Sequence, residues 1–202
     1  MATLTIKPTA AGNDIQIKSG DGLTTHATFG NTSTVNMSAG TIASAVTFPN
    51  GHILQVQTAS KTNISTTTAT TPTSTGLTVS ITPSDATNKV YVQALVGSVG
   101  HNGALQRMFI SISGGTSQST GDARAGHECG AFWCPRSADS AWSSGSLVCG
   151  FLDAPASTSA QTYTLNFWQS VTGNICVINS SYNTDAATGN CISTLTAWEV
   201  VA

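Results

Sequence analysis

Charged side chains are the scarcest feature of this sequence. Only 8% of the 202 residues are charged, and the formal net charge is −2. The seven Lys and Arg residues are scattered between Lys7 and Arg136 and form no basic patch. Proteins that bind nucleic acids gather basic side chains to neutralise phosphates. The sequence therefore predicts no nucleic-acid partner.

Long apolar runs are also missing. No run approaches the ~20 residues that a helix needs to span a bilayer, so we expect no membrane insertion. The N-terminal stretch MATLTIKPTAAGND lacks the charged segment followed by an apolar segment that marks a cleaved secretory signal. We therefore expect the protein to be made and folded in a cytosol.

Helical periodicity is the third absence. No segment repeats its apolar residues at the 3.6-residue period of a helix. Ser, Thr and Val are frequent, there are 19 Gly residues, and Lys and Glu are rare. This composition favours strands and turns. The chain is also long enough to bury a sizeable core.

Two parts are visible along the chain. Residues 1–50 hold short alternating runs such as TLTIK and IQIK, separated by turn signals such as SGDG. Runs this short bury little alone, so we expect the segment to pack on other copies of itself or on a partner. Residues 51–202 hold longer runs and are predicted to form one β-domain.

The second part contains alternating runs of the kind that strands show. Apolar residues alternate at 77–81 and at 90–94, and the PSDATN between them carries turn chemistry, which predicts a hairpin whose second strand is central. The Thr-rich residues 62–76 are read as a long loop or an edge strand. Two further sets are predicted to share a face within their strands: Met108, Ile110 and Ile112, and Tyr163, Leu165 and Phe167.

About eight strand candidates follow residue 52 at short spacing, which predicts an all-β fold, an antiparallel β-sandwich of the jelly-roll kind. The run STLTAWEV at the C-terminus is expected to be tied into the sheet.

Four stretches carry a resemblance to a known family. They are TLTIKPTAAGNDIQIKSGDG, GHILQVQTASKT, TGLTVSITPSDATNKVYVQALVG and STLTAWEVV. Together they resemble bacteriophage virion proteins, the tail-fibre and capsid-fibre-like proteins frequent in phages of marine and cyanobacterial hosts. The resemblance covers the N-terminal part and both ends of the second part, while residues 100–190 match least. These motifs are structural rather than catalytic.

The resemblance implies a role and an assembly. Members of this kind are non-enzymatic, and their C-terminal β-domains are similar to compact trimeric heads of the tumour-necrosis-factor or C1q type. Their N-terminal part typically attaches to the virion. For this chain the resemblance implies a homotrimer, located in the virion after assembly in the host cytoplasm, whose residues 1–50 attach to other virion proteins.

The stretch GHECGAFWCPR, residues 126–136, gathers residue types that bind metals. Zinc sites use close Cys pairs followed by a second pair. In an extended strand Cys129 and Cys134 would point to opposite faces, about 16 Å apart at ~3.3 Å per residue. Only a turn at Gly130 would bring them together with His127. We therefore interpret the stretch as a strand at the interior of a sandwich or at an oligomer interface, and we predict no metal.

Catalytic constellations are equally hard to assemble. A nucleophile needs a base within hydrogen-bond reach, and only His127 among the four His residues sits beside Cys and Glu. There is no G-x-S-x-G motif, and Glu128 and Glu199 are the only glutamates. The sequence predicts no enzymatic activity and no cofactor.

The five Cys residues lie in the last part of the chain: Cys129, Cys134, Cys149, Cys176 and Cys191. Their number is odd, and folding in a cytosol favours reduced, buried thiols. Disulfide formation after release from the cell stays open.

Two polar loops are candidates for ligand binding. Arg136 and Trp142 lie among Ser and Gly in one loop, and Tyr182 and Asp185 lie among Asn and Thr in another. An aromatic side chain in such a loop offers a flat apolar face with a polar group attached. A surface or receptor-binding role for these loops competes with burial of Trp142 at a sheet edge or subunit interface, which is the more common fate of large aromatics.

Low charge also bears on assembly. Ser- and Thr-rich strands with few charges leave sheet edges unprotected, and oligomers with closed symmetry hide them. Three hypotheses from different classes remain, of which a metal- or thiol-dependent enzyme at His127, Cys129 and Cys134 is disfavoured by the arguments above. The first is a virion structural protein that decorates the particle or contacts the host surface. The alternative is a lectin-like carbohydrate-binding module that recognises a host glycan.

Overall fold

The fold was examined in a computed structural model, which describes residues 48–101, 107–115, 132–135, 143–169, 172–180 and 191–202. The chain divides into two units, Met1–Val46 and Thr47–Ala202, and the described residues all belong to the second. The described residues contain strands and no helix, and they therefore include no helix that is long and apolar enough to cross a membrane. Residues 1–47 lie outside the described part, and the role predicted for residues 1–50 stays a prediction.

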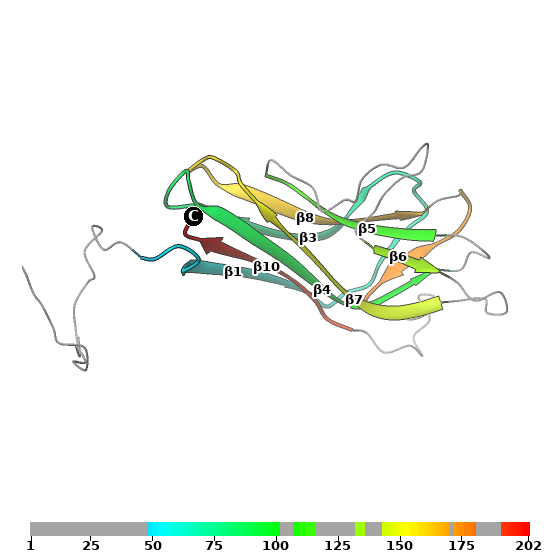
Figure 1. The fold of residues 1–202 in the computed structure, drawn as a ribbon. Helices are drawn as coiled ribbons and strands as arrows, with labels where there is room; N and C mark the ends of the chain where they lie inside the picture. Colours follow the sequence, from blue (N-terminus) through cyan, green and yellow to red (C-terminus); the bar gives the residue numbers. More distant parts are fainter. Residues whose placement is uncertain (1–47, 102–106, 116–131, 136–142, 170–171, 181–190) are drawn as a thin grey trace, which may run out of the picture. The chain divides into compact units, whose positions relative to one another are not determined.

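In the described part of the chain, ten strands form two antiparallel sheets that lie face to face (Figure 1). The strands are β1 (Ile53–Lys61), β2 (Ser65–Thr67), β3 (Thr73–Ile81), β4 (Lys89–His101), β5 (Arg107–Ser113), β6 (Phe132–Pro135), β7 (Ser143–Asp153), β8 (Gln161–Gln169), β9 (Cys176–Ile178) and β10 (Ser193–Val200). The all-β sandwich predicted from the sequence is therefore confirmed.

The larger sheet is organised around β4. β7 pairs with β4 from residue 90 to residue 101. β10 pairs with residues 89–95 of β4 and β9 with residues 99–101, so these two strands follow one another along the other edge. β1 lies beyond β10, and β2 lies beyond β9. The placement of 90–94 in a central strand is confirmed.

The smaller sheet has the order β3-β8-β5-β6. The predicted hairpin between 77–81 and 90–94 is therefore wrong, because β3 pairs with β8 while β4 belongs to the other sheet. The residues 82–88 between them cross from one sheet to the other. Turn chemistry and alternation are the same for a hairpin and for a connection between sheets, so the sequence could not separate the two. β3 faces β1 and β10 of the larger sheet, and its apolar residues share one core with those of β4.

The core is built from the inward faces of both sheets. The residues predicted to share faces on β3, β4, β5 and β8 are buried there, together with Leu195 and Ala197 of β10. Burying a side chain of this size contributes roughly 1.5–3 kcal/mol each. The burial of β10 between β1 and β4 also confirms that the C-terminal run is tied into the sheet.

Two further strand predictions have different outcomes. The Thr-rich stretch does contain a short edge strand, β2, which pairs only with β9 among the described strands. The interior position suggested for 126–136 is wrong for its described residues. β6 covers Phe132–Pro135 and, among the described strands, pairs with β5 alone at the end of the smaller sheet, with Cys134 opposite Met108.

Gly97 marks an irregularity in β4. The register with β7 shifts between Val96 and Val99, and the backbone that leads into β10 passes directly over Gly97. A Cβ added at Gly97 would overlap the carbonyl oxygen of Ile192 and come within 2.8 Å of the Cys191 Cβ. The Gly97 backbone N–H donates to Ser193 Oγ (3.2 Å).

We predict that Gly97→Ala destabilises the fold. The added methyl group must displace backbone, and overpacking of this kind costs about 1–3 kcal/mol. Urea unfolding followed by tryptophan fluorescence measures the loss. Gly145→Ala is the matched control, because a Cβ there has no neighbour within 4 Å. Equal stability of the two variants would contradict the packing described.

Candidate functional site

The loop residues predicted to bind ligands are outside the described part of the structure. This applies to Arg136, Trp142, Tyr182 and Asp185, and also to His127 and Cys129. Their surface and receptor-binding roles stay predictions. Within the described ranges, no group of three His, Cys, Asp or Glu side chains is placed to hold a metal ion.

The cysteines whose side chains are described form no disulfide: Cys149, Cys176 and Cys191. Cys176 is fully buried, and its Sγ lies 3.7 Å from the carbonyl oxygen of Trp168. Burial raises the pKa of Cys149 to about 11. Its thiol is therefore protonated at neutral pH and is a poor nucleophile.

Glu199 is a buried carboxylate that holds one connection between the sheets. It extends from β10 toward residues 82–88 and is fully buried. Its oxygens accept hydrogen bonds from the Ser84 backbone N–H (2.6 Å), Ser84 Oγ (2.7 Å), Asn88 Nδ2 (2.7 Å) and Gln55 Nε2 (2.7 Å). All four donors are neutral groups. Burial alone would raise the pKa of Glu199, but the hydrogen bonds from Ser84, Gln55 and Asn88 together lower it.

Asp153 is a second buried acid at the same end of the sandwich. The two acids flank Val90 in register, since β4 places Val90 opposite Glu199 on one side and opposite Asp153 on the other. The Tyr163 hydroxyl donates to Asp153 Oδ2 (2.9 Å). Burial, the hydrogen bond to Asp153 and its negative charge all raise the pKa of Tyr163 above its ordinary value. This bond spans another connection between the sheets, residues 154–160.

Asn179 is a third buried polar side chain, and it joins segments of the larger sheet. It is fully buried and adopts a left-handed φ of 64°, which Asn tolerates better than most residues. Its Nδ2 donates to the carbonyls of Lys61 (2.9 Å) and Asn63 (3.1 Å), and its Oδ1 accepts from Ser193 Oγ. Its backbone N–H donates to Ser98 (2.8 Å). One side chain thus joins three segments that are distant in sequence.

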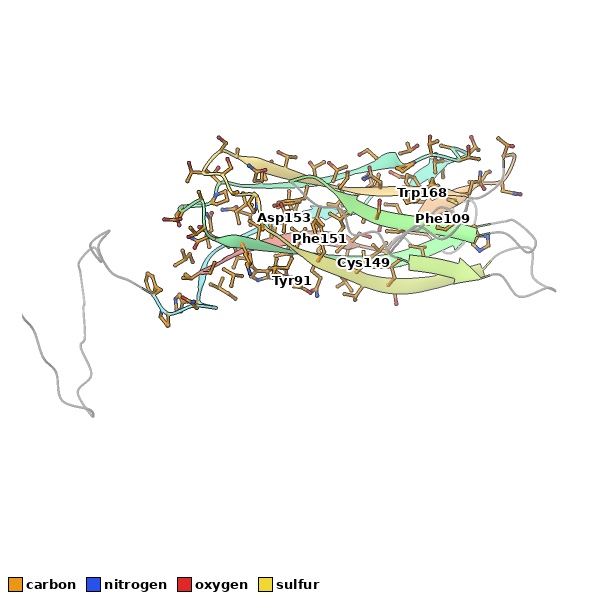
Figure 2. The ribbon with its side chains drawn as sticks, turned by 45° about the horizontal axis from the view of Figure 1, so that its top comes forward. Tyr91, Phe109, Cys149, Phe151, Asp153 and Trp168 are labelled. Carbon is orange, nitrogen blue, oxygen red and sulfur yellow. The ribbon has the colours of Figure 1, made fainter. Side chains whose placement is uncertain are left out.

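The outer face of the larger sheet has a different chemistry. Val56 lies opposite Trp198, Trp198 opposite Tyr91, and Tyr91 opposite Leu152. These four residues, here called the apolar row, cross β1, β10, β4 and β7 on the side away from the core. Figure 2 shows Tyr91 on that side, with Phe151 and Asp153 facing the smaller sheet. The Tyr91 and Trp198 rings lie 5.5 Å apart between centroids.

A second apolar pair lies four residues along the same strands, on β4 and β7. Leu95 of β4 is opposite Val148 of β7. The large side chains left exposed on the described residues include both of these: Ile53, Val56, Tyr91, Leu95, Val148, Leu152 and Ile192, with exposed fractions between 36% and 58%. Six of the seven belong to β1, β4 and β7 of the larger sheet. Single exposed apolar residues are ordinary, whereas a contiguous group marks an interaction surface.

Between the apolar row and this pair runs a row of small or polar residues: Thr58, Thr196, Gln93 and Gly150. The Tyr91 ring leans over it, since the Tyr91 hydroxyl accepts from Gln93 Nε2 (3.2 Å) and lies 3.1 Å from where a Gly150 Cβ would be. An aromatic ring that covers a glycine in a neighbouring strand shields its exposed backbone. We call the outer side of β1, β10, β4 and β7 the outer face.

The sequence indicated which residues of β4 share a face, but not which of its two faces is exposed. Tyr91, Gln93 and Leu95 alternate with the core residues of β4, and this pattern predicted a central strand. Periodicity reports that both faces are apolar. Only the position of the second sheet decides which face is buried.

Comparison with known proteins adds no family. No protein-family model and no curated protein matches this sequence.

We predict that Glu199→Gln destabilises the protein and changes its pH dependence. The amide would turn a donor toward groups that are themselves donors, and the loss is about 2–4 kcal/mol at pH 7. Because the folded-state pKa of Glu199 is lowered, its stabilising effect is present above the unfolded pKa of about 4.3 and is lost as the pH falls through the folded pKa. The gap between wild type and variant should therefore close in acid.

Urea unfolding at pH 7 and at lower pH values tests this expectation. Asp85→Asn is the matched control, because Asp85 lies on the same connection but is exposed, and its carboxylate accepts hydrogen bonds from the neighbouring Thr87. A Glu199→Gln variant as stable at pH 7 as Asp85→Asn would show that the buried carboxylate does not hold the connection.

Proposed function

We propose that this protein is a non-enzymatic structural component of a phage particle, a fibre or decoration protein whose β-sandwich is a head carried on an N-terminal attachment segment. The head assembles as a homo-oligomer, with a trimer as the expected form, and it contacts the host surface. The four stretches that resemble virion fibre proteins motivate the proposal, and the observation that carries it is the way the head begins.

The head begins with a joint between its first residues and the last strand. The Gly51 N–H donates to the Val201 carbonyl (2.8 Å), and the Val201 N–H donates to the His52 carbonyl (2.9 Å). The rings of Phe48 and His52 stack at 4.5 Å between centroids. The chain is therefore fixed from Phe48 onward, immediately after the segment proposed to attach to the particle.

The joint leads directly into β1, the first strand in the order of the larger sheet. β1 pairs with β10 from Ile53 to Lys61, and β10 pairs on its other side with β4. Antiparallel hydrogen bonds are perpendicular to the strands, so a pull on residue 48 along β1 loads many of these bonds together. A head tethered through its N-terminus needs this resistance.

The use of the buried ionisable groups also supports a structural role. Glu199 and Asp153 are fully buried, and their hydrogen bonds fix the connections between the sheets. Catalytic acids are instead placed in a cleft, within reach of a substrate. These two carboxylates therefore stabilise the fold of the head.

Particles purified from the infected host test the proposal. We expect mass spectrometry to detect the full chain in particles, whereas a chain lacking residues 1–47 should be absent from them. The shortened chain must show the thermal unfolding transition of the full-length head, so that loss of folding is not the cause. Absence of the full chain from particles would contradict the virion role, and equal recovery of both chains would contradict attachment through the N-terminal segment.

A carbohydrate-binding module is the second candidate, and the Tyr91–Trp198 pair is the observation that favours it. Aromatic rings on an open sheet face can stack on sugar rings, and Gln93 and Thr196 provide polar neighbours on the same face. The side chains on either side of the pair in its own row are aliphatic, however, since Val56 and Leu152 border it. An aliphatic border fits a protein surface better than a sugar, which needs hydrogen bonds to its hydroxyls.

A glycan array separates the two candidates. If the second is correct, the full chain should bind a glycan, and Tyr91→Ala or Trp142→Ala should weaken that binding at least tenfold. Thr162→Ala, on the outer side of the smaller sheet, is the control. The absence of binding to any glycan would remove this candidate.

A further inference from the structure

We infer that the outer face of the larger sheet is the surface on which a second copy of this chain packs. This inference rests on the homo-oligomer proposed above and names its contact surface. The residues that make the contact are the apolar row (Val56, Trp198, Tyr91 and Leu152) and the pair Leu95 and Val148.

Exposure is the first argument. Val148 is 58% exposed although it lies in the middle of the eleven-residue strand β7. Leu152, near the end of the same strand, is 52% exposed. Apolar surface on this scale is unfavourable in water by roughly 25 cal/mol per Å². The opposite sheet shows the contrast, since the outward residues of β3 are Ser74, Gly76, Thr78 and Ser80, which are polar or lack a side chain.

Charge identifies the kind of partner. Among the outward residues of β1, β10, β4 and β7, Lys89 is the one charged side chain, and it lies at the end of β4 opposite Val200. The acids of these strands, Glu199 and Asp153, point into the core. A neutral apolar face fits a partner that is itself neutral and apolar, rather than a nucleic acid or a charged membrane surface.

The arrangement of the apolar residues suits a second copy. The apolar row crosses all four strands, and the Leu95–Val148 pair adds to it on β4 and β7. In a trimer each copy places a different part of its surface on its neighbour. The edge strand β7 carries Val148 and Leu152 and can take part in such a contact. Another chain of the same low charge therefore supplies the neutral, apolar chemistry that this surface needs.

The area of the face is close to what a stable interface needs. Four strands about 4.8 Å apart and about eight residues long at ~3.3 Å give a plane of roughly 500 Å². Stable interfaces bury about 800 Å² on each partner. Side-chain relief adds to the plane, and the partner can extend past β7, because β7 pairs with β4 alone among the described strands.

Burial of this face would also hide an edge. β7 is eleven residues long and contains no Lys, Arg or Pro to discourage pairing with other chains. A partner that covers Val148 and Leu152 covers the same edge. The low charge of the sequence then becomes compatible with a soluble particle component.

Size-exclusion chromatography with light scattering of the full chain tests the inference. We expect a homo-oligomer, and we expect Leu152→Asp or Leu95→Asp to weaken its association at least tenfold, because a carboxylate would be buried without a partner. Thr78→Asp is the matched control, since it adds the same charge to an exposed strand position on the other sheet. Each variant must keep the thermal unfolding transition of a folded monomer.

A measurement on the unmodified chain covers the case in which a variant fails to fold. Hydroxyl-radical footprinting at concentrations above and below assembly should show protection of Leu152 and Tyr91 in the oligomer, with Thr162 unchanged. An oligomer that leaves Leu152 and Tyr91 unprotected, or that survives both substitutions, overturns the inference but leaves the homo-oligomer standing. A monomer at every concentration overturns both, while the recovery of the chain in particles tests the virion role separately.

Discussion

The pairing of β4 is the constraint on which the rest of this structure depends. β4 is bonded along one edge to β7 and along the other first to β10 and then to β9. Its register places Val90, Val92 and Ala94 in the core and Tyr91, Gln93 and Leu95 outside. A shift of one residue would exchange these two sets, because side chains alternate between faces. The core, the buried acids and the outer face are therefore fixed together.

The buried polar groups follow from the same pairing. Once Val90 is fixed in register, Glu199 and Asp153 lie on either side of it, at the end where the chain crosses between sheets. A buried carboxylate is costly unless its oxygens are bonded. Ser84, Asn88 and Gln55 supply donors to Glu199, and Tyr163 supplies one to Asp153. Because a displaced connection would leave a buried charge without its hydrogen bonds, these bonds favour the observed position of each connection over other positions.

The outward sides of the two sheets differ in their chemistry. On the smaller sheet the exposed outward residues of β3 and its neighbour carry hydroxyl groups, such as the Ser80 and Thr162 pair whose oxygens are 2.8 Å apart, while the stacked rings of Phe109 and Trp168 on the same side are buried. The larger sheet presents the apolar row. Water is an adequate partner for the first surface and a poor one for the second. This asymmetry connects the fold to the assembly that we propose, and it does so without any contribution from the loops first considered as binding sites.

Several features could be read from the sequence because they depend on local chemistry. Alternation identified the strands and the inward residues of β3, β4, β5 and β8, and turn residues identified 83–88 as a connection. The partner of each strand could not be read in this way. Residues 77–81 and 90–94 looked like a hairpin, and the stretch around Cys134 looked like an interior strand, because the local pattern is the same whichever strand lies alongside.

The candidate site shows the same division. Arg136, Trp142, Tyr182 and Asp185 were chosen from loop composition, which says nothing of the surface that the strands themselves present. The sequence alone determined that this is an all-β protein with little charge and with apolar residues on both sides of its fourth strand. Only the tertiary structure decided which of those sides is covered, because burial depends on where the second sheet packs, and that is set by pairings between residues far apart in the chain.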